Sequence, residues 1–128
     1  MTTTKNRADI SDALKEYLKA VYKLSLKYTE VRITDISKFL GISKPSVNRA
    51  VNALKNIGLV EHRPYGSIFL TENGTAEAER ITEKDDTAAR FLSVALGISY
   101  EDALADASVI SGKLSEDTLA KMKKYIQN

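Results

Sequence analysis

A tight turn between two short amphipathic segments is the feature that most restricts how this chain can fold. Gly41-Ile42-Ser43 separates residues 35–40 from residues 44–57. Glycine suits the left-handed conformation that ends a helix, and serine suits the N-cap that begins the next one. Pro45 then falls in the first turn of the second helix, where its missing N–H group breaks no hydrogen bond. The pattern predicts two helices joined by a glycine-containing turn.

The second of these helices is expected to have one apolar face and one polar, basic face. Its apolar residues recur with helical spacing, which predicts a buried stripe of Val47, Ala50, Val51, Leu54 and Ile57 that ends at Gly58. The opposite face carries Ser46, Asn48, Arg49, Asn52 and Lys55. A polar helix directly after such a turn is typical of the recognition helix of a helix-turn-helix.

Two short β-prone segments follow the recognition helix. Residues 59–63 and 67–71 lie on either side of Pro64-Tyr65-Gly66, and β-prone segments around a proline and glycine turn predict a hairpin. A hairpin placed directly after a helix-turn-helix forms a wing. The sequence therefore predicts a winged helix-turn-helix.

Amphipathic segments on both sides complete a mainly α-helical chain with one small β-hairpin. The first helix is expected to begin near Ile10 with Asp9 or Ser11 as its N-cap, and Thr34 is the expected N-cap of the short helix before the turn. A small β-bridge is expected at residues 31–33. After the hairpin, the expected helices cover residues 72–96 with Thr71 as the cap, residues 99–110, and a last segment that begins at Ser115.

The chain is expected to divide into two domains. Residues 1–71 form the winged helix-turn-helix DNA-binding domain, and residues 72–128 form an all-helical dimerisation domain. The second domain carries more apolar surface than so short a lobe needs for its own core, so we expect part of that surface to meet a second copy of the chain.

Composition argues against an enzyme and against a membrane protein. The 128 residues include no cysteine and one histidine, His62, which excludes thiol chemistry and leaves few groups for acid–base catalysis. Asp85 and Asp86 are adjacent, so on a helix they point about 100° apart and form no catalytic pair. No apolar segment approaches the roughly 20 residues of a membrane span, and residues 1–10 lack the apolar core of a secretory signal. We expect a cytoplasmic protein without catalytic activity.

Charge is divided unevenly along the chain. Residues 1–71 hold twelve Lys and Arg against six Asp and Glu, whereas residues 72–128 hold seven against eleven. A basic first half fits a lobe that binds double-stranded DNA. Chance scatter of surface charge is the alternative.

The residue types on the predicted recognition helix suit the edges of DNA bases. The guanidinium of Arg49 matches the paired acceptors of guanine, and the amides of Asn48 and Asn52 match adenine. Phosphates are expected to pass Ser37, Ser43, Lys44 and Lys55, and the wing offers His62, Arg63 and Tyr65, although His62 fits a surface histidine equally well. The predicted DNA-binding residues are Ser37, Ser43, Lys44, Pro45, Ser46, Asn48, Arg49, Asn52, Lys55, Arg63 and Tyr65.

These residues also carry a family resemblance over nearly the whole chain. The segments LKEYLKAVYKL, VRITDISKFLGISKPSVNRAVNALKNIGLVEHRPYGSIFLTENG, RFLSVALGIS and KLSEDTL, with Asp106-Ala107 between the last two, resemble the metal-dependent repressors of the diphtheria-toxin-repressor type. The sequence is most similar to the short manganese-transport-regulator branch. The resemblance implies a homodimeric winged-helix repressor that binds a near-palindromic DNA operator and is activated by Mn²⁺ or Fe²⁺.

Most of the metal ligands that this resemblance implies are substituted. In the manganese branch the first helix presents an Asp and a Glu, the long helix a His, and the next helix two Glu and a His. The matching positions here hold Glu16, Lys19, Asp85, Ser108, Ser111 and Gly112. Only Glu16 and Asp85 keep a carboxylate and remain candidates, so no metal is expected at the family positions. Mn²⁺ or Fe²⁺ is implied by the resemblance alone, and no cofactor is predicted from the residues.

Three alternatives stay open. The winged helix could be a protein-interaction module that has lost its DNA contact. Lys19 could be a solvated lysine, or its ammonium could stand in for the missing cation and pair with Glu16 or Asp85. A relocated acidic metal site could use Asp85, Asp86, Glu101, Asp102 or Asp106, although acids at these positions also serve as helix caps and solvated charges.

Overall fold

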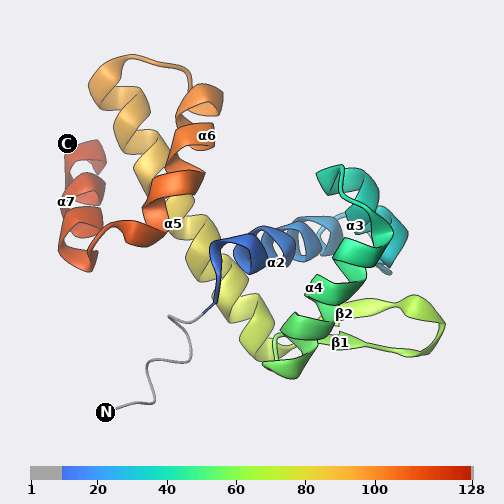
Figure 1. Cartoon of the computed structure of the whole chain (residues 1–128). Helices are drawn as coiled ribbons and strands as arrows, with labels where there is room; N and C mark the ends of the chain where they lie inside the picture. Colours follow the sequence, from blue (N-terminus) through green and yellow to red (C-terminus); the bar gives the residue numbers. More distant parts are fainter. Residues whose placement is uncertain (1–9, 128) are drawn as a thin grey trace, which may run out of the picture. The chain divides into compact units, whose positions relative to one another are not determined.

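The computed structural model describes residues 10–127 and divides the chain into two compact units, Met1–Glu79 and Arg80–Asn128 (Figure 1). Among the residues described, the first unit holds three complete helices, the start of a fourth and a hairpin, and the second unit is helical. The long helix α5 (Glu72–Leu96) begins in the first unit and continues into the second. The mainly helical fold class with one small hairpin is confirmed.

Three helices form the core of the first unit: α2 (Asp12–Ser25), α3 (Ile33–Leu40) and α4 (Lys44–Asn56). Each pair of them is in contact, and α2 also contacts a strand of the hairpin. The fully buried side chains they contribute are Leu18, Val21, Ile36, Val47, Val51 and Leu54. Ser11 is the N-cap of α2, and its hydroxyl accepts a hydrogen bond from the Leu14 N–H at 3.1 Å. The amphipathic spacing in the sequence therefore gives a three-helix core.

The turn between α3 and α4 has the predicted local structure. Gly41 adopts a positive φ of 68°, and its N–H donates to the Ser37 carbonyl at 2.8 Å. Ser43 is the N-cap of α4, and Pro45 lies in its first turn. This geometry confirms the helix-turn-helix.

The start of α3 differs from the prediction. The helix begins at Ile33 with Arg32 as the N-cap residue, so the prediction of Thr34 as the cap is wrong. The Asp35 carboxylate accepts a hydrogen bond from the Arg32 backbone N–H at 2.9 Å. Because a side chain inside the first turn reaches back to the exposed amide, the helix begins before the residue that looked like its cap. The expected β-bridge is confined to Val31, which pairs with Ile68 of the hairpin.

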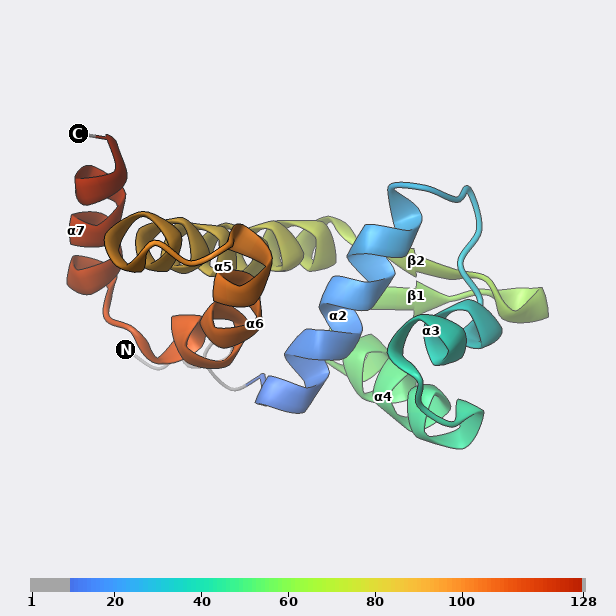
Figure 2. The ribbon, with the colours of Figure 1, turned by 90° about the horizontal axis from the view of Figure 1, so that it is seen from above.

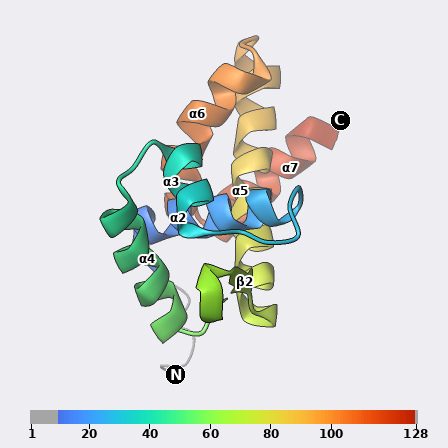
Figure 3. The same ribbon diagram turned by 90° about the vertical axis from the view of Figure 1, so that its right-hand side faces the viewer.

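The wing is a short antiparallel hairpin whose strands are β1 (Val60–His62) and β2 (Ile68–Leu70). Glu61 pairs with Phe69 at the centre, and a single 3-10 turn, η1 (Pro64–Gly66), joins the strands. Figure 3 shows the hairpin below α2 and beside α4.

Ile57, predicted to complete the buried stripe of α4, is instead 52% exposed. The helix ends at Asn56, and Ile57 leaves the helical rotation with φ −100° and ψ 10°.

The second unit consists of the later part of α5 with α6 (Tyr100–Ile110) and α7 (Glu116–Gln127). A short 3-10 segment, η2 (Ser111–Lys113), joins the last two. Both predicted serine caps are present, because the Ser99 hydroxyl accepts from the Asp102 N–H and the Ser115 hydroxyl accepts from the Thr118 N–H. Figure 2 shows α6 and α7 beside this part of α5.

Small side chains form the centre of the second unit. The fully buried core consists of Ala88, Ala89, Ala103 and Ala107. Larger apolar residues, including Leu92, Leu104 and Met122, pack against these alanines. The alanine side chains of α5 and α6 belong to one buried cluster. Several large apolar side chains of the same unit stay exposed: Val94, Leu96, Val109 and Tyr125.

Candidate nucleic-acid interface

The polar face of α4 is exposed along its length. Val47, Val51 and Leu54 on the opposite face are fully buried, which fixes the rotation of the helix. The side chains left outside include Lys44, Asn48, Arg49, Asn52 and Lys55. Exposed donors on a helix held by its buried face are the arrangement that major-groove recognition requires.

A chain of hydrogen bonds links Arg49, in the second turn of α4, to the N-cap residue Ser43. The Ser43 hydroxyl donates to the Ser46 hydroxyl at 3.0 Å, and Arg49 Nη2 donates to the same Ser46 oxygen at 3.2 Å. The Ser46 hydroxyl therefore orders the guanidinium while most of its N–H donors stay available. Residues in the N-terminal half of a recognition helix reach the bases, and Arg49 is the sixth of the 13 residues of α4, so it is a candidate for base contact.

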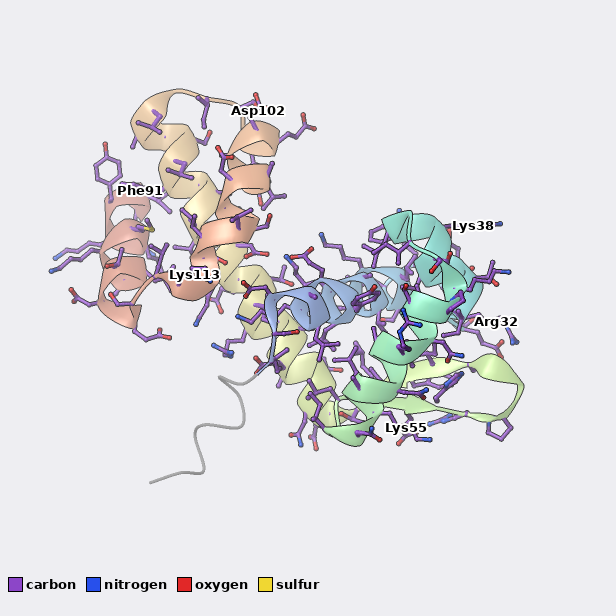
Figure 4. The ribbon with its side chains drawn as sticks, viewed as in Figure 1. Arg32, Lys38, Lys55, Phe91, Asp102 and Lys113 are labelled. Carbon is purple, nitrogen blue, oxygen red and sulfur yellow. The ribbon has the colours of Figure 1, made fainter. Side chains whose placement is uncertain are left out.

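The remaining predicted residues of the helix-turn-helix take up different roles. The hydroxyl of Ser37 donates to the Ile42 carbonyl, so this side chain stabilises the turn. Lys44 and Pro45 are exposed in the first turn of α4. Lys55, labelled in Figure 4, is exposed near the other end of the helix. The two lysines predicted to contact phosphates therefore lie near opposite ends of the recognition helix.

The wing holds Arg63 in place by two contacts. Its Nε and Nη2 donate to one Glu61 oxygen at 3.1 Å and 3.0 Å, and its guanidinium carbon lies 4.0 Å from the centre of the Phe69 ring. His62, the last residue of β1, is half-buried. The side chain of Tyr65, also predicted to bind DNA, lies outside the part of the chain that the structure describes.

Arg32 was missed by the sequence analysis. Its Nη2 lies 2.8 Å from Glu30 Oε1, and its Nη1 lies 3.6 Å from the point that a Cβ atom would occupy at Gly66. The side chain therefore lies beside the hairpin turn (Figure 4). The sequence did contain one indication. An arginine at a helix N-terminus is disfavoured by the helix dipole, so its presence there suggests a role outside the helix.

Comparison with known proteins covers both units. Residues 9–68 match the domain described as "Iron dependent repressor, N-terminal DNA binding domain", and residues 71–128 match "Iron dependent repressor, metal binding and dimerisation domain". The chain belongs to the iron dependent repressor family. This family consists of transcriptional regulators, which confirms that the chain is not an enzyme.

Individual known proteins are similar to most of this chain. It is 30% identical to an uncharacterised HTH-type transcriptional regulator (MJ0568) of Methanocaldococcus jannaschii over 92% of this chain and 95% of that protein. It is 31% identical to the transcriptional regulator MntR of Escherichia coli O6:H1, over 91% of this chain and 74% of that protein. The crystal structure of T. acidophilum IdeR matches with a TM-score of 0.80 and 28% identity, over 89% of this chain. This chain spans 54% of that IdeR chain.

The family resemblance raises the question of whether this chain can hold a metal, and in the first unit the residues do not fit. Lys19 Nζ lies 2.9 Å from Glu16 Oε2, and the Lys19 side chain is only 7% exposed. An ammonium group donates hydrogen bonds and cannot ligate a cation. The Glu16 carboxylate is already paired, and the interpretation of Lys19 as a solvated lysine is wrong.

The second unit offers no better set of ligands. The Ser111 hydroxyl donates to Asp85 Oδ1, and both side chains are buried. The Ser108 hydroxyl donates to the Ala105 carbonyl of its own helix at 3.0 Å, and Gly112 has no side chain to offer. A hydroxyl in place of a carboxylate or imidazole is a poor ligand for Mn²⁺ or Fe²⁺.

Among the described residues, the acidic side chains do not gather into a relocated metal site either. Asp86 accepts hydrogen bonds from Arg90 Nε at 2.9 Å and from the Tyr100 hydroxyl at 2.6 Å, and the Asp86 hydrogen bond raises the pKa of Tyr100. Within residues 10–127, no three Asp, Glu, His or Cys side chains gather closely enough to hold a metal ion. The searched part of the chain also contains no helix with the length and apolarity needed to cross a membrane.

Proposed function

We propose that the chain is a sequence-specific, DNA-binding transcriptional repressor that acts as a homodimer on a near-palindromic operator. The observation that carries this proposal is the exposed polar face of α4, on which Ser46 orders Arg49 in the second turn of the helix. Two such helices in a dimer enter successive major grooves about one helical turn apart. We also propose residues 1–71 as the DNA-binding domain and residues 72–128 as the dimerisation domain.

We further propose that DNA binding does not respond to Mn²⁺ or Fe²⁺ at the usual family positions. The Lys19–Glu16 ion pair and the Asp85–Ser111 hydrogen bond support this proposal, because each occupies a carboxylate that a metal would need. These two interactions involve no metal ion, so we expect them to persist when Mn²⁺ or Fe²⁺ is withdrawn.

The test measures DNA affinity in the presence and absence of metal. Fluorescent duplexes are first enriched from a random library with the wild-type protein, once in chelator and once with Mn²⁺. Fluorescence anisotropy at two salt concentrations then gives Kd for the best duplex and for a shuffled duplex. We expect tight, salt-dependent and sequence-specific binding in chelator, with Kd changed less than twofold by Mn²⁺ or Fe²⁺. A tenfold gain with metal overturns metal independence, and equal weak binding to both duplexes favours a protein-interaction module.

Dimer formation is a separate prediction. Val109 is 68% exposed and Leu96 is 66% exposed in the second unit, and burying large side chains of this kind is the main driving force for association. By sedimentation at micromolar concentration we expect twice the 14.1 kDa chain mass. Val109→Glu or Leu96→Glu should shift the protein towards the monomer.

The matched control for the dimer prediction is Leu26→Glu. Leu26 is 70% exposed but lies in the first unit, so this variant should remain dimeric. A monomeric wild-type protein, or a dimer broken by Leu26→Glu and not by the second-unit variants, contradicts the prediction.

A further inference from the structure

Two arginines lie at the hairpin turn. Each forms an ion pair with the glutamate two positions before it in the sequence. Arg63 is the residue that precedes η1, and Arg32 lies against Gly66, the last residue of η1. Glu61 pairs with Arg63 and Glu30 pairs with Arg32. The repetition of one charge arrangement on two separate elements is not explained by folding, because exposed ion pairs contribute little to stability.

The Arg63 guanidinium contacts both a carboxylate and an aromatic ring. Glu61 and Phe69 face each other across the hairpin, so the carboxylate and the aromatic ring contact the same guanidinium. The Arg63 backbone N–H also donates to the Ser67 carbonyl at 2.7 Å. Only Nε and one N–H of Nη2 are used by Glu61, so the Nη1 hydrogens remain free to meet a phosphate without breaking the pair.

The Arg32 pair is held from the other side of the turn. The Arg32 backbone N–H is fixed by Asp35, and its Nη2 is fixed by Glu30 at 2.8 Å. About half of the surface of each side chain stays exposed, at 48% for Arg32 and 56% for Glu30. The guanidinium is therefore positioned by its partners and still accessible.

We propose that Glu30 and Glu61 are specificity-determining residues that restrain Arg32 and Arg63, which contact DNA phosphates on either side of the wing turn. A free arginine attracts any phosphate, and this attraction supplies nearly all non-specific affinity. A carboxylate beside the guanidinium cancels most of that long-range attraction. When α4 is seated on its operator, however, the restrained N–H groups meet phosphates at a fixed position and lose little conformational freedom.

This inference rests on the proposed DNA-binding function, and it predicts opposite behaviour for the acids and the bases. Glu30→Gln and Glu61→Gln should each raise affinity for a shuffled duplex by about twofold to fivefold, the size of effect that an exposed ion pair supports. Affinity for the enriched duplex should change less than twofold, so the specificity ratio falls. Arg32→Ala and Arg63→Ala should each reduce the salt slope on the enriched duplex by about one.

Asp117→Asn is the matched control. It makes the same change in net charge by removing an exposed carboxylate that pairs with Lys121 on α7, in the second unit. We expect it to leave the specificity ratio unchanged. Anisotropy titrations of all five variants on both duplexes, with circular dichroism melts to show that the variants fold, complete the experiment.

The outcomes separate this inference from the function on which it rests. If no duplex is enriched by the wild-type protein, both the proposed function and this inference are overturned. If the wild-type protein binds specifically but Glu30→Gln and Glu61→Gln behave like Asp117→Asn, the inference alone is overturned. Unchanged salt slopes for both arginine variants also overturn it.

Discussion

Arg49→Ala should lose about tenfold to a hundredfold in affinity for the enriched duplex, because a two-pronged arginine–guanine contact is worth about 1–3 kcal/mol of discrimination. The loss should be largest for sequences that carry guanine at one defined position in each half-site. Affinity for a shuffled duplex should fall only by the contribution of one positive charge. Anisotropy titrations on the enriched duplex and on single-base variants of it measure both effects.

Lys55→Ala is the control for charge alone. Lys55 lies on the same face of α4 as Arg49, and its flexible ammonium suits a phosphate contact better than a base contact. This variant should weaken binding to all duplexes about equally and reduce the salt slope by about one. If Arg49→Ala and Lys55→Ala give the same uniform loss, Arg49 is not a base-reading residue.

Gly74→Ala should destabilise the first unit severely. A Cβ atom at residue 74 would lie 1.8 Å from the Leu59 carbonyl oxygen and 2.8 Å from the carbonyl carbon, and backbone atoms cannot rotate away as a flexible side chain can. The same region is tied together by Thr71, whose hydroxyl donates to the Gly58 carbonyl at 2.7 Å and accepts from the Gly74 N–H at 2.9 Å. We expect a loss of about 3 kcal/mol, which corresponds to a fall in Tm of roughly 10 °C or more.

The helix propensity of alanine makes this a demanding test. In an unobstructed helix, glycine to alanine is stabilising by about 1 kcal/mol, so the expected result has the opposite sign. Ala76→Gly, at an exposed position of the same helix, is the control and should cost only about 1 kcal/mol. Thermal melts followed by circular dichroism compare the two. A Gly74→Ala protein that melts at or above the wild-type temperature contradicts the close approach of α5 to Leu59.

The features that could be predicted from the sequence depend on short stretches of chain. Gly41 and Ser43 act on their immediate neighbours, so the turn, its cap and the recognition helix followed from local rules. Local rules failed at Thr34, because the carboxylate of Asp35 moved the start of α3. They also failed at Ile57, because the helix ends one residue before the apolar pattern does.

The site features that the sequence did not reveal depend on residues far apart in the chain. Arg32 became a candidate only when the fold placed it beside Gly66, and Asp85 is paired with Ser111, 26 positions further along. The sequence likewise did not show that the Lys19 side chain is buried, at 7% exposed. Spacing identifies a helix face, but it does not show which distant groups will share a contact.

The Lys19–Glu16 pair has a consequence for the timing of regulation under the proposed metal independence. A bound metal ion can dissociate within the lifetime of one protein molecule, whereas an ammonium attached to the chain cannot leave. Operator occupancy would then follow the number of protein molecules in the cell, which changes only through synthesis, degradation and dilution by growth. The occupancy of the operator would then depend on earlier synthesis of the regulator and not on the present concentration of metal.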